Sequence, residues 1–184
     1  MPRAGLSPAA LVELAIAELD ESGGEPLSLG AVATRAGVKT PSIYKHVAGL
    51  PALEALVAAH IYDDLGDVLE AALGEGDSEA RGADAVRAFL HAYRSFAVRH
   101  PGRYRWLPVQ PSGHPVLEAA AERVLTIAGR AVEGERGDEA IHALRGLRAV
   151  AHGFATLEAA GGFGMPADVD ASFEHLVEAV ATAR

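Results

Sequence analysis

Polar side chains that can donate hydrogen bonds gather in a short segment near the N-terminus. This segment holds the only two lysines of the 184-residue chain, together with several hydroxyl groups. A lysine offers a positive charge to phosphate oxygens, and a hydroxyl group can bond to a phosphate or to a base edge. The residues with this chemistry are Lys39, Thr40, Ser42, Tyr44, Lys45 and His46. Their types favour contact with a nucleic acid.

The charge of the chain is distributed unevenly around the same segment. The whole chain carries a net charge of -9, but the window from Pro26 to Leu53 contains three cations and no acid. This window is therefore +3, while the remainder is -12. Since phosphate contacts reward a basic face, the window is a candidate DNA-binding surface within an acidic protein.

Motifs of catalysis and metal binding are absent from the sequence. It contains no H-E-x-x-H, no G-x-S-x-G and no phosphate-binding loop, and residues 161–164 lack both the third glycine and the preceding strand of a dinucleotide site. There is no cysteine, which excludes disulfides and thiolate ligands. Isolated histidines such as His142 are more often surface or hydrogen-bonded groups than metal ligands. We therefore expect no catalytic residue, no metal and no cofactor.

Three residues have the spacing of a helix-turn-helix unit. Such a unit needs a small residue where its two helices cross, a turn residue that tolerates left-handed backbone angles, and an apolar anchor on the second helix. Ala33, Gly37 and Ile43 meet these needs in order, and Val38 follows the turn. The second helix of such a unit enters the major groove of DNA. The alternative is a helical hairpin over residues 27–50 with no role in DNA binding.

On these residues the sequence resembles the TetR family of transcriptional regulators. The resemblance rests on the stretches Leu27–Ala33, Ala36–Val38 and Thr40–Val47, with Leu53 opening the helix that follows. It implies that the residues matching Thr40, Pro41 and Ser42 approach bases, and that those matching Ser28, Tyr44 and His46 approach phosphates. Family members often carry basic residues where this chain has Gly30 and Leu50. We therefore expect that phosphate affinity is either weak or draws on Arg3 and Arg35.

The pattern of apolar residues is helical nearly throughout. Apolar residues recur at intervals of three and four, and we find no convincing strand. Ser7 followed by Pro8, Ser28, and Thr40 followed by Pro41 mark three helix starts, with ends at Gly23, Gly37 and about residue 46. Further helices are expected over about residues 50–73, 78–100, 116–133, 138–160 and 168–182, with a loop over 107–115. We expect an all-α protein of about nine helices, with a DNA-binding domain at residues 1–48 and a helical ligand-binding and dimerisation domain at 49–184.

Aromatic residues are concentrated on one predicted helix and just after it. Such a cluster with a few polar groups is typical of a pocket for an apolar or aromatic small molecule, although plain core packing is the alternative. The candidate pocket residues are Phe89, Tyr93, Phe96, Arg103, Tyr104, Trp106, His114, His152 and Phe154. The stretches Tyr104–Trp106 and Ala151–Gly153 resemble those of a family subgroup that has a Trp-His-Gly-like motif. This chain has Ala151 where that motif has tryptophan.

Small residues recur along the predicted helix over residues 138–160. Gly146, Gly153 and Ala160 are seven residues apart, a spacing that lets another helix approach closely. With Phe173 and Leu176 of the last helix, they form the predicted interface of a homodimer, similar to the four-helix interface of the family. A glycine-rich composition without an interface is the alternative. A dimer would set two recognition helices about 34 Å apart, one turn of DNA.

These patterns together indicate a ligand-responsive transcriptional regulator. The resemblance implies a repressor that binds a palindromic operator as a dimer and is released by a small-molecule effector. A helical protein-binding adaptor is the alternative, and it would explain the acidic helices but not the basic window. No apolar run approaches the roughly 20 residues that span a bilayer, and we see no secretory signal, so we expect a cytoplasmic protein that does not associate with membranes.

Overall fold

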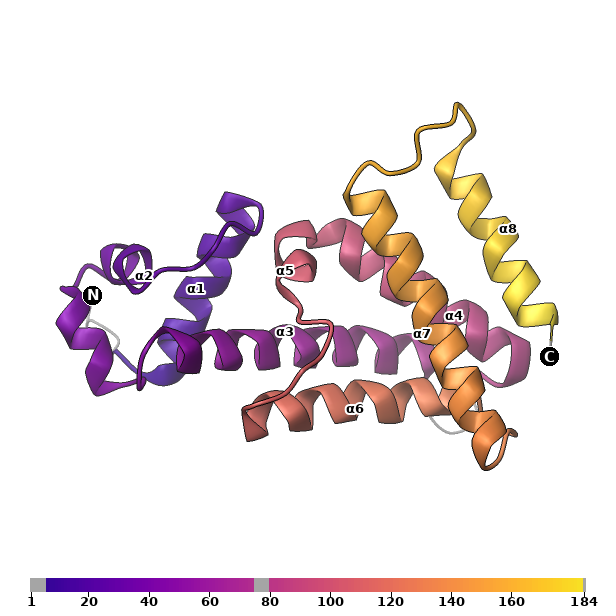
Figure 1. Cartoon of the computed structure of the whole chain (residues 1–184), viewed down its shortest axis with the longest axis horizontal. Coiled ribbons are helices and arrows are strands. Elements are labelled where there is room, and N and C mark those ends of the chain that lie inside the picture. The colour runs from indigo at the N-terminus through magenta and orange to yellow at the C-terminus, as the bar shows by residue number, and fades with distance from the viewer. Residues whose placement is uncertain (1–5, 75–79, 184) are drawn as a thin grey trace. The chain divides into compact units, whose positions relative to one another are not determined.

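The computed structural model describes residues 6–74 and 80–183. All regular elements in these ranges are helical, apart from an isolated bridge between Glu133 and Glu135. The helices are α1 (Pro8–Ser22), α2 (Leu29–Ala36), the 3₁₀ helix η1 (Thr40–Lys45), α3 (Leu50–Leu73), α4 (Gly82–Arg99), α5 (Pro101–Trp106), α6 (Pro115–Ala131), α7 (Asp138–Ala159) and α8 (Val169–Thr182). Within these ranges the expectation of an all-α protein of about nine helices is confirmed. Figure 1 draws the labelled elements as coiled ribbons.

Local sequence signals fix the ends of the first two helices. The Ser7 hydroxyl accepts a hydrogen bond from the amide of Ala10 at 3.1 Å, and Ser28 caps α2 in the same way through Ala31 at 3.1 Å. Gly23 and Gly37 end these helices with left-handed backbone angles, φ 72° and 67°. The predicted bounds of both helices are therefore confirmed.

Two predicted elements differ from the structure. The third helix is a 3₁₀ helix, and its N-cap is Lys39 instead of Thr40. The segment after Pro101 was not expected to be helical, but α5 begins at Pro101 itself. Proline can occupy the first turn of a helix because the amide it lacks has no partner there, so Pro101 ends one helix and begins the next. The predicted start at Ser78 lies outside the described residues.

The chain divides into two compact units that are built from discontinuous segments. The first contains residues 1–63 and 100–121, and the second contains residues 64–99 and 122–184. The first unit therefore includes α5 as well as the helix-turn-helix, and α3 and α6 each begin in the first unit and end in the second. The division at residue 48 differs from this grouping and stays a prediction about where the two functions lie.

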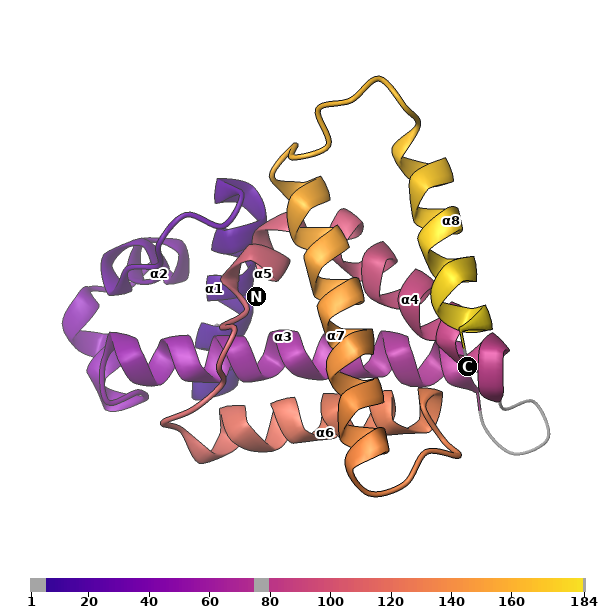
Figure 2. The same ribbon diagram turned by 45° about the vertical axis from the view of Figure 1, so that its right-hand side comes forward.

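Each unit has its own apolar core. In the first, α1 packs against α2 and α5, and its Leu11, Ala15 and Leu19 are 0% exposed, as are Val32 of α2 and Ile43 of η1. In the second, α4 packs against both α7 and α8 (Figure 2). Phe96 and Phe173 are among its largest buried side chains.

Candidate nucleic-acid interface

The turn between α2 and η1 has the geometry that its sequence predicts. Gly37 has φ 67°, and the amide of Val38 donates to the carbonyl of Ala33 at 3.0 Å. Ala33 of α2 is 2% exposed and Ile43 of η1 is 0% exposed, and the two helices are in contact. The roles assigned to Ala33, Gly37 and Ile43 from their spacing are those that the structure shows.

The 3₁₀ geometry of η1 sorts its side chains into three rows. With three residues per turn, residues i and i+3 lie above one another. Thr40, Ile43 and His46 form the inward row, in which Ile43 is buried and the other two are half-buried. Pro41 and Tyr44 form a second row, and Tyr44 is 59% exposed.

The third row of η1 and the residue before the helix carry its positive charges. The row contains Ser42 and Lys45, and Lys39 precedes it as the N-cap with extended backbone angles; both lysines are exposed and Ser42 is half-buried. Within the described residues, neither lysine forms an ion pair, so both charges are available to a ligand. Ser28 is also exposed, with its hydroxyl engaged as the cap of α2. The outward surface at η1 therefore offers the ammonium groups of Lys39 and Lys45 and the hydroxyl groups of Ser42 and Tyr44.

Arg35 has a different role from the one expected of it. Its guanidinium donates to Glu18 at 3.1 Å and to Oε1 of Glu21 at 2.9 Å, both carboxylates belonging to α1. The hydrogen bonds and charge of Arg35 hold the pKa of Glu21 below its ordinary value of 4.5. The structure thus assigns Arg35 to the contact between α1 and α2 instead of to a phosphate. Arg3 lies outside the described residues.

The predicted pocket residues fall in both compact units. Phe89, Tyr93, Phe96, His152 and Phe154 belong to the second unit, and Arg103, Tyr104, Trp106 and His114 belong to the first. Arg103 donates to the Asp20 carboxylate at 2.7 Å, so it connects α5 to α1. Tyr104 is 4% exposed, and Nδ1 of His114 is buried without a hydrogen-bond partner in the described part of the chain.

Within the second unit, Tyr93 and His152 form a polar pair among the aromatic residues. The Tyr93 hydroxyl lies 3.4 Å from Nδ1 of His152, which joins α4 to α7. Burial, and secondarily the charge of Arg148, lowers the pKa of His152 from its ordinary 6.5. Phe89, Phe96 and Phe154 are all buried, at 3%, 1% and 8% exposure. The structure therefore brings these five residues into one unit, and their role in effector binding stays a prediction.

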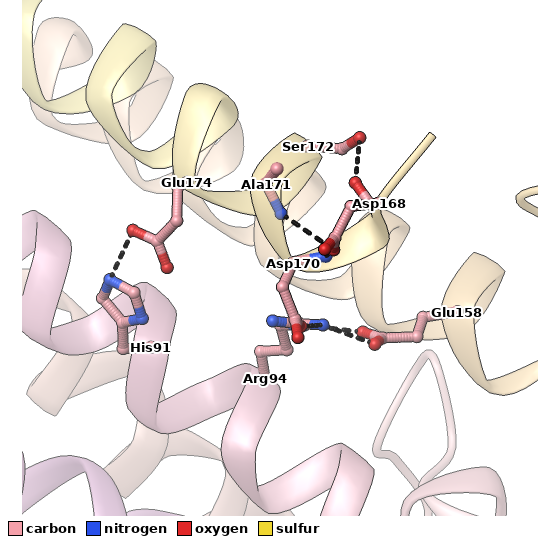
Figure 3. Close-up of polar contacts among 8 residues, drawn as sticks. All are labelled: His91, Arg94, Glu158, Asp168, Asp170, Ala171, Ser172 and Glu174. Atoms are coloured by element: carbon pink, nitrogen blue, oxygen red, sulfur yellow. Dashed lines mark hydrogen bonds and ion pairs between the residues drawn. The ribbon is translucent and has the colours of Figure 1, made fainter. Parts of the chain in front are cut away.

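A charged cluster at the α7–α8 connection was not found from the sequence. Arg94 of α4 donates from Nε and Nη2 to the two oxygens of Glu158 at 2.7 and 2.6 Å, and from Nη2 to Asp170 at 2.5 Å (Figure 3). Its guanidinium carbon lies 4.7 Å from the ring centre of Phe173 and 5.6 Å from that of Phe154. The available signal was the position of Arg94, which follows Val86 and Leu90 by eight and four residues on an apolar helix face.

Four of the five predicted interface residues are accessible, at least in part, in the single chain. A side chain added at Gly146 or Gly153 would meet nothing within 4 Å, Ala160 is exposed and Leu176 is half-buried. Gly146 also lines an open groove of about 430 Å³ between α7 and α8. Phe173 is 1% exposed, because it packs inside the unit against Phe154 and His91. It therefore belongs to the core instead of the exposed surface.

The described residues contain no cluster of three or more metal-ligating side chains. None of their helices is both long enough and apolar enough to cross a membrane.

Comparison with known proteins gives matches over nearly the whole chain. Residues 86–180 match the family model of the tetracyclin repressor-like C-terminal domain. An uncharacterized HTH-type transcriptional regulator of Mycobacterium tuberculosis is 36% identical over 178 residues, which is 95% of this chain and 79% of the relative. The uncharacterized HTH-type transcriptional regulator YobS of Bacillus subtilis is 31% identical over 174 residues, 91% of this chain and 87% of the relative.

Solved structures have the same fold. A protein of unknown function from Rhodococcus sp. RHA1 matches with a TM-score of 0.79 and 25% identity, over 99% of this chain and 97% of the other. A TetR variant from Acinetobacter baumannii AYE, in complex with minocycline, matches with a TM-score of 0.71 and 18% identity, over 97% and 96% of the two chains. The second match shows the fold alone.

Proposed function

Because this chain belongs to the TetR family of helix-turn-helix transcriptional regulators, which are not enzymes, we propose that it is a repressor that binds a palindromic operator as a homodimer and is released by a small molecule. The observation that carries the DNA-binding part is that Lys39, Ser42 and Lys45 keep exposed surface on and just before η1, while Ile43 anchors this helix in the core. These side chains are hydrogen-bond donors at η1, and this helix is held by the hydrogen-bonded turn at Gly37.

In this proposal some residues at η1 contact the phosphates of the DNA and others contact its bases. Lys39 and Lys45 contact phosphates as point charges, and Tyr44 donates its exposed hydroxyl to the backbone. Thr40, Pro41 and Ser42 approach the bases, and Ser28 and His46 contact phosphates at the edges. The site of action is the cytoplasm, where the operator lies.

The homodimer uses the small residues of α7 and of its C-cap, together with α8. Gly146, Gly153 and Ala160 offer no bulky side chain, so a helix of a second copy can approach the backbone closely. Leu176 and the groove beside Gly146 supply apolar surface. Such an isologous interface relates two recognition helices by a two-fold axis, which a palindromic operator mirrors.

The effector binds in the helical domain at the aromatic residues of α4 and α7. The ring of the buried Phe89 lies beside that of Tyr93, with their centres 6.0 Å apart, and the lowered pKa of His152 favours its neutral form. We infer an apolar or aromatic effector that exchanges a hydrogen bond with the Tyr93–His152 pair. The solved TetR variant binds minocycline. The Ala151–Gly153 stretch on α7 further suggests the Trp-His-Gly subgroup. The effector releases DNA only if it favours one spacing of the recognition helices over another.

A mobility-shift assay tests the DNA-binding part. The wild type is expected to retard a duplex from its own upstream region, or one selected from a random pool, in preference to bulk DNA. Tyr44→Ala and Lys45→Ala should each weaken this binding by about tenfold or more, because each removes a contact to a charged phosphate. Arg136→Ala, at an exposed cation outside the basic window, is the matched control and should bind as the wild type does. A folded protein that prefers no sequence would refute the proposal.

A further inference from the structure

α7 and α8 owe their relative position to α4. Each of them packs extensively against α4, whereas they contact one another only sparsely. The chain between them, residues 160–168, is not helical. An element that sets the geometry of the α7–α8 pair must therefore act from α4.

Arg94 is the α4 side chain with charged contacts to both helices. It binds Glu158 in the last turn of α7 through two parallel hydrogen bonds, and Asp170 in the first turn of α8 through a third (Figure 3). The start of α8 is itself fixed by Asp168, whose Oδ1 accepts from the amide of Asp170 at 2.7 Å. One guanidinium thus connects the end of one helix to the capped start of the next.

The surroundings of Arg94 hold it in a single geometry. Its side chain is 16% exposed, and Glu158 is 22% exposed. The guanidinium lies over the ring of Phe173, which is buried in the core. A planar guanidinium can bind a carboxylate with two bonds while it stacks on a ring, and a lysine ammonium cannot replace that combination.

Arg87 provides an internal comparison on the same helix. It also binds a carboxylate through two bonds, to Glu178 of α8 at 2.7 and 2.8 Å. Its remaining bond is to Asp84 of α4 itself, and its side chain is 31% exposed. Arg87 therefore connects α4 to α8 in a similar way to Arg94, but without the connection to α7.

We propose that Arg94 is the positioning residue of the homodimer, holding the ends of α7 and α8 at the separation that makes their exposed surfaces complementary to a second copy. The inference rests on the proposed homodimer. In this proposal Arg94 controls how tightly two copies associate, although the second copy does not need to contact Arg94.

The test is the dissociation constant of the dimer for the full chain, measured by sedimentation over a dilution series. Arg94→Met, which keeps apolar bulk on Phe173, is expected to raise this constant by about tenfold or more. Arg94→Lys should give a similar loss, because it cannot make the paired bonds. Arg87→Met should change the constant by no more than about twofold.

A purely structural role gives a different result. In that case Arg94→Met lowers the melting temperature while the dissociation constant, measured well below unfolding, stays close to that of Arg87→Met, and the proposal is overturned. If Arg94→Met does not fold, Glu158→Gln keeps the shape of the site and weakens only the α7 connection. It is expected to raise the constant more than Asp170→Asn, since Asp170 is 80% exposed. If neither Glu158→Gln nor Asp170→Asn raises the constant, the proposal is also overturned.

Failure of the homodimer itself would look different. A wild-type chain that stays monomeric at every concentration removes the dimer from the proposed function and Arg94 with it. A wild-type dimer that Arg94→Met leaves intact removes only the role of Arg94.

Discussion

Arg35 and Lys45 both carry positive charge in the helix-turn-helix, but their surroundings give them different roles. Arg35 is enclosed by Glu18 and Glu21 of α1, while Lys45 has no ion-pair partner in the described ranges. An arginine fork binds carboxylates through several bonds, which suits a structural contact. A lysine on an outward row keeps its charge for a ligand. Composition alone counts these two cations as equivalent.

Replacing Arg35 with methionine should make the protein less stable at neutral pH, by an amount that depends on pH. Because Arg35 lowers the pKa of Glu21 in the folded state, its contribution is present above the ordinary value of 4.5 and is lost as the pH falls through the lower folded value. The difference in melting temperature between wild type and Arg35→Met is therefore expected to narrow under acid conditions. Circular dichroism melts across this range measure it, with Lys45→Met as the control. A difference that stays constant with pH would contradict the assignment.

Among the elements, α5 is a helix that could not be predicted from the sequence. The caps Ser7 and Ser28 and the glycines Gly23 and Gly37 act within a few residues, so the ends of α1 and α2 could be predicted from local chemistry. A helix of six residues is too short for a periodic pattern, and Pro101 has the same sequence signature whether it ends a helix or begins one. The placement of α5 depends on contacts with α1, which no local pattern contains.

The candidate sites divide in the same way. The helix-turn-helix that presents the candidate DNA-binding residues could be predicted because turn chemistry and one buried anchor fix it locally, but the 3₁₀ geometry of η1 could not. Phe173 was assigned to a dimer surface because it lies on an apolar stripe, and a stripe does not tell whether α4 or a second copy covers it. Arg94 was missed because its partners, Glu158 and Asp170, are 64 and 76 residues away along the chain. Long-range ion pairs leave no spacing signal.

The contact between α5 and α1 is made by backbone against backbone. A Cβ added at Gly102 would overlap the carbonyl oxygen of Leu19, and one added at Gly24 would lie 2.8 Å from the carbonyl oxygen of Gly102. Arg103 and Arg105 add bonds to Asp20 and to the Gly23 carbonyl. Glycine is thus required at position 102 by close approach, since its φ is not in the left-handed range.

Gly102→Ala should therefore destabilise the chain, even though alanine is the better helix former. Overpacking against a helical carbonyl is expected to cost about 1–3 kcal/mol. Gly129→Ala on α6 is the matched control, because a Cβ there meets nothing within 4 Å. It should be neutral or stabilising by up to about 1 kcal/mol. The free energies of unfolding of the two variants are compared by urea denaturation, provided that the dependence of the free energy on urea concentration is unchanged. Equal stability of both variants would mean that α5 does not lie on α1 in solution.

The whole molecule is acidic, with a net charge of -9, yet its proposed partner is a polyanion. Such a protein cannot rely on general attraction to DNA, so its affinity must come from a few cations in the basic window. Lys39 and Lys45 are the two lysines of that window and of the chain. Their contribution should therefore be visible in the salt dependence of binding.

The slope of log affinity against log salt tests both the contacts and the stoichiometry. Each phosphate contact contributes about 0.9 to this slope. A dimer loses one contact from each protomer in Lys45→Ala, so the slope should fall by about 1.8, whereas a monomer would lose only about 0.9. Arg136→Ala, at an exposed cation outside the window, should leave the slope unchanged. If Lys45→Ala also leaves it unchanged, Lys45 does not contact phosphate and is not part of the electrostatic interface.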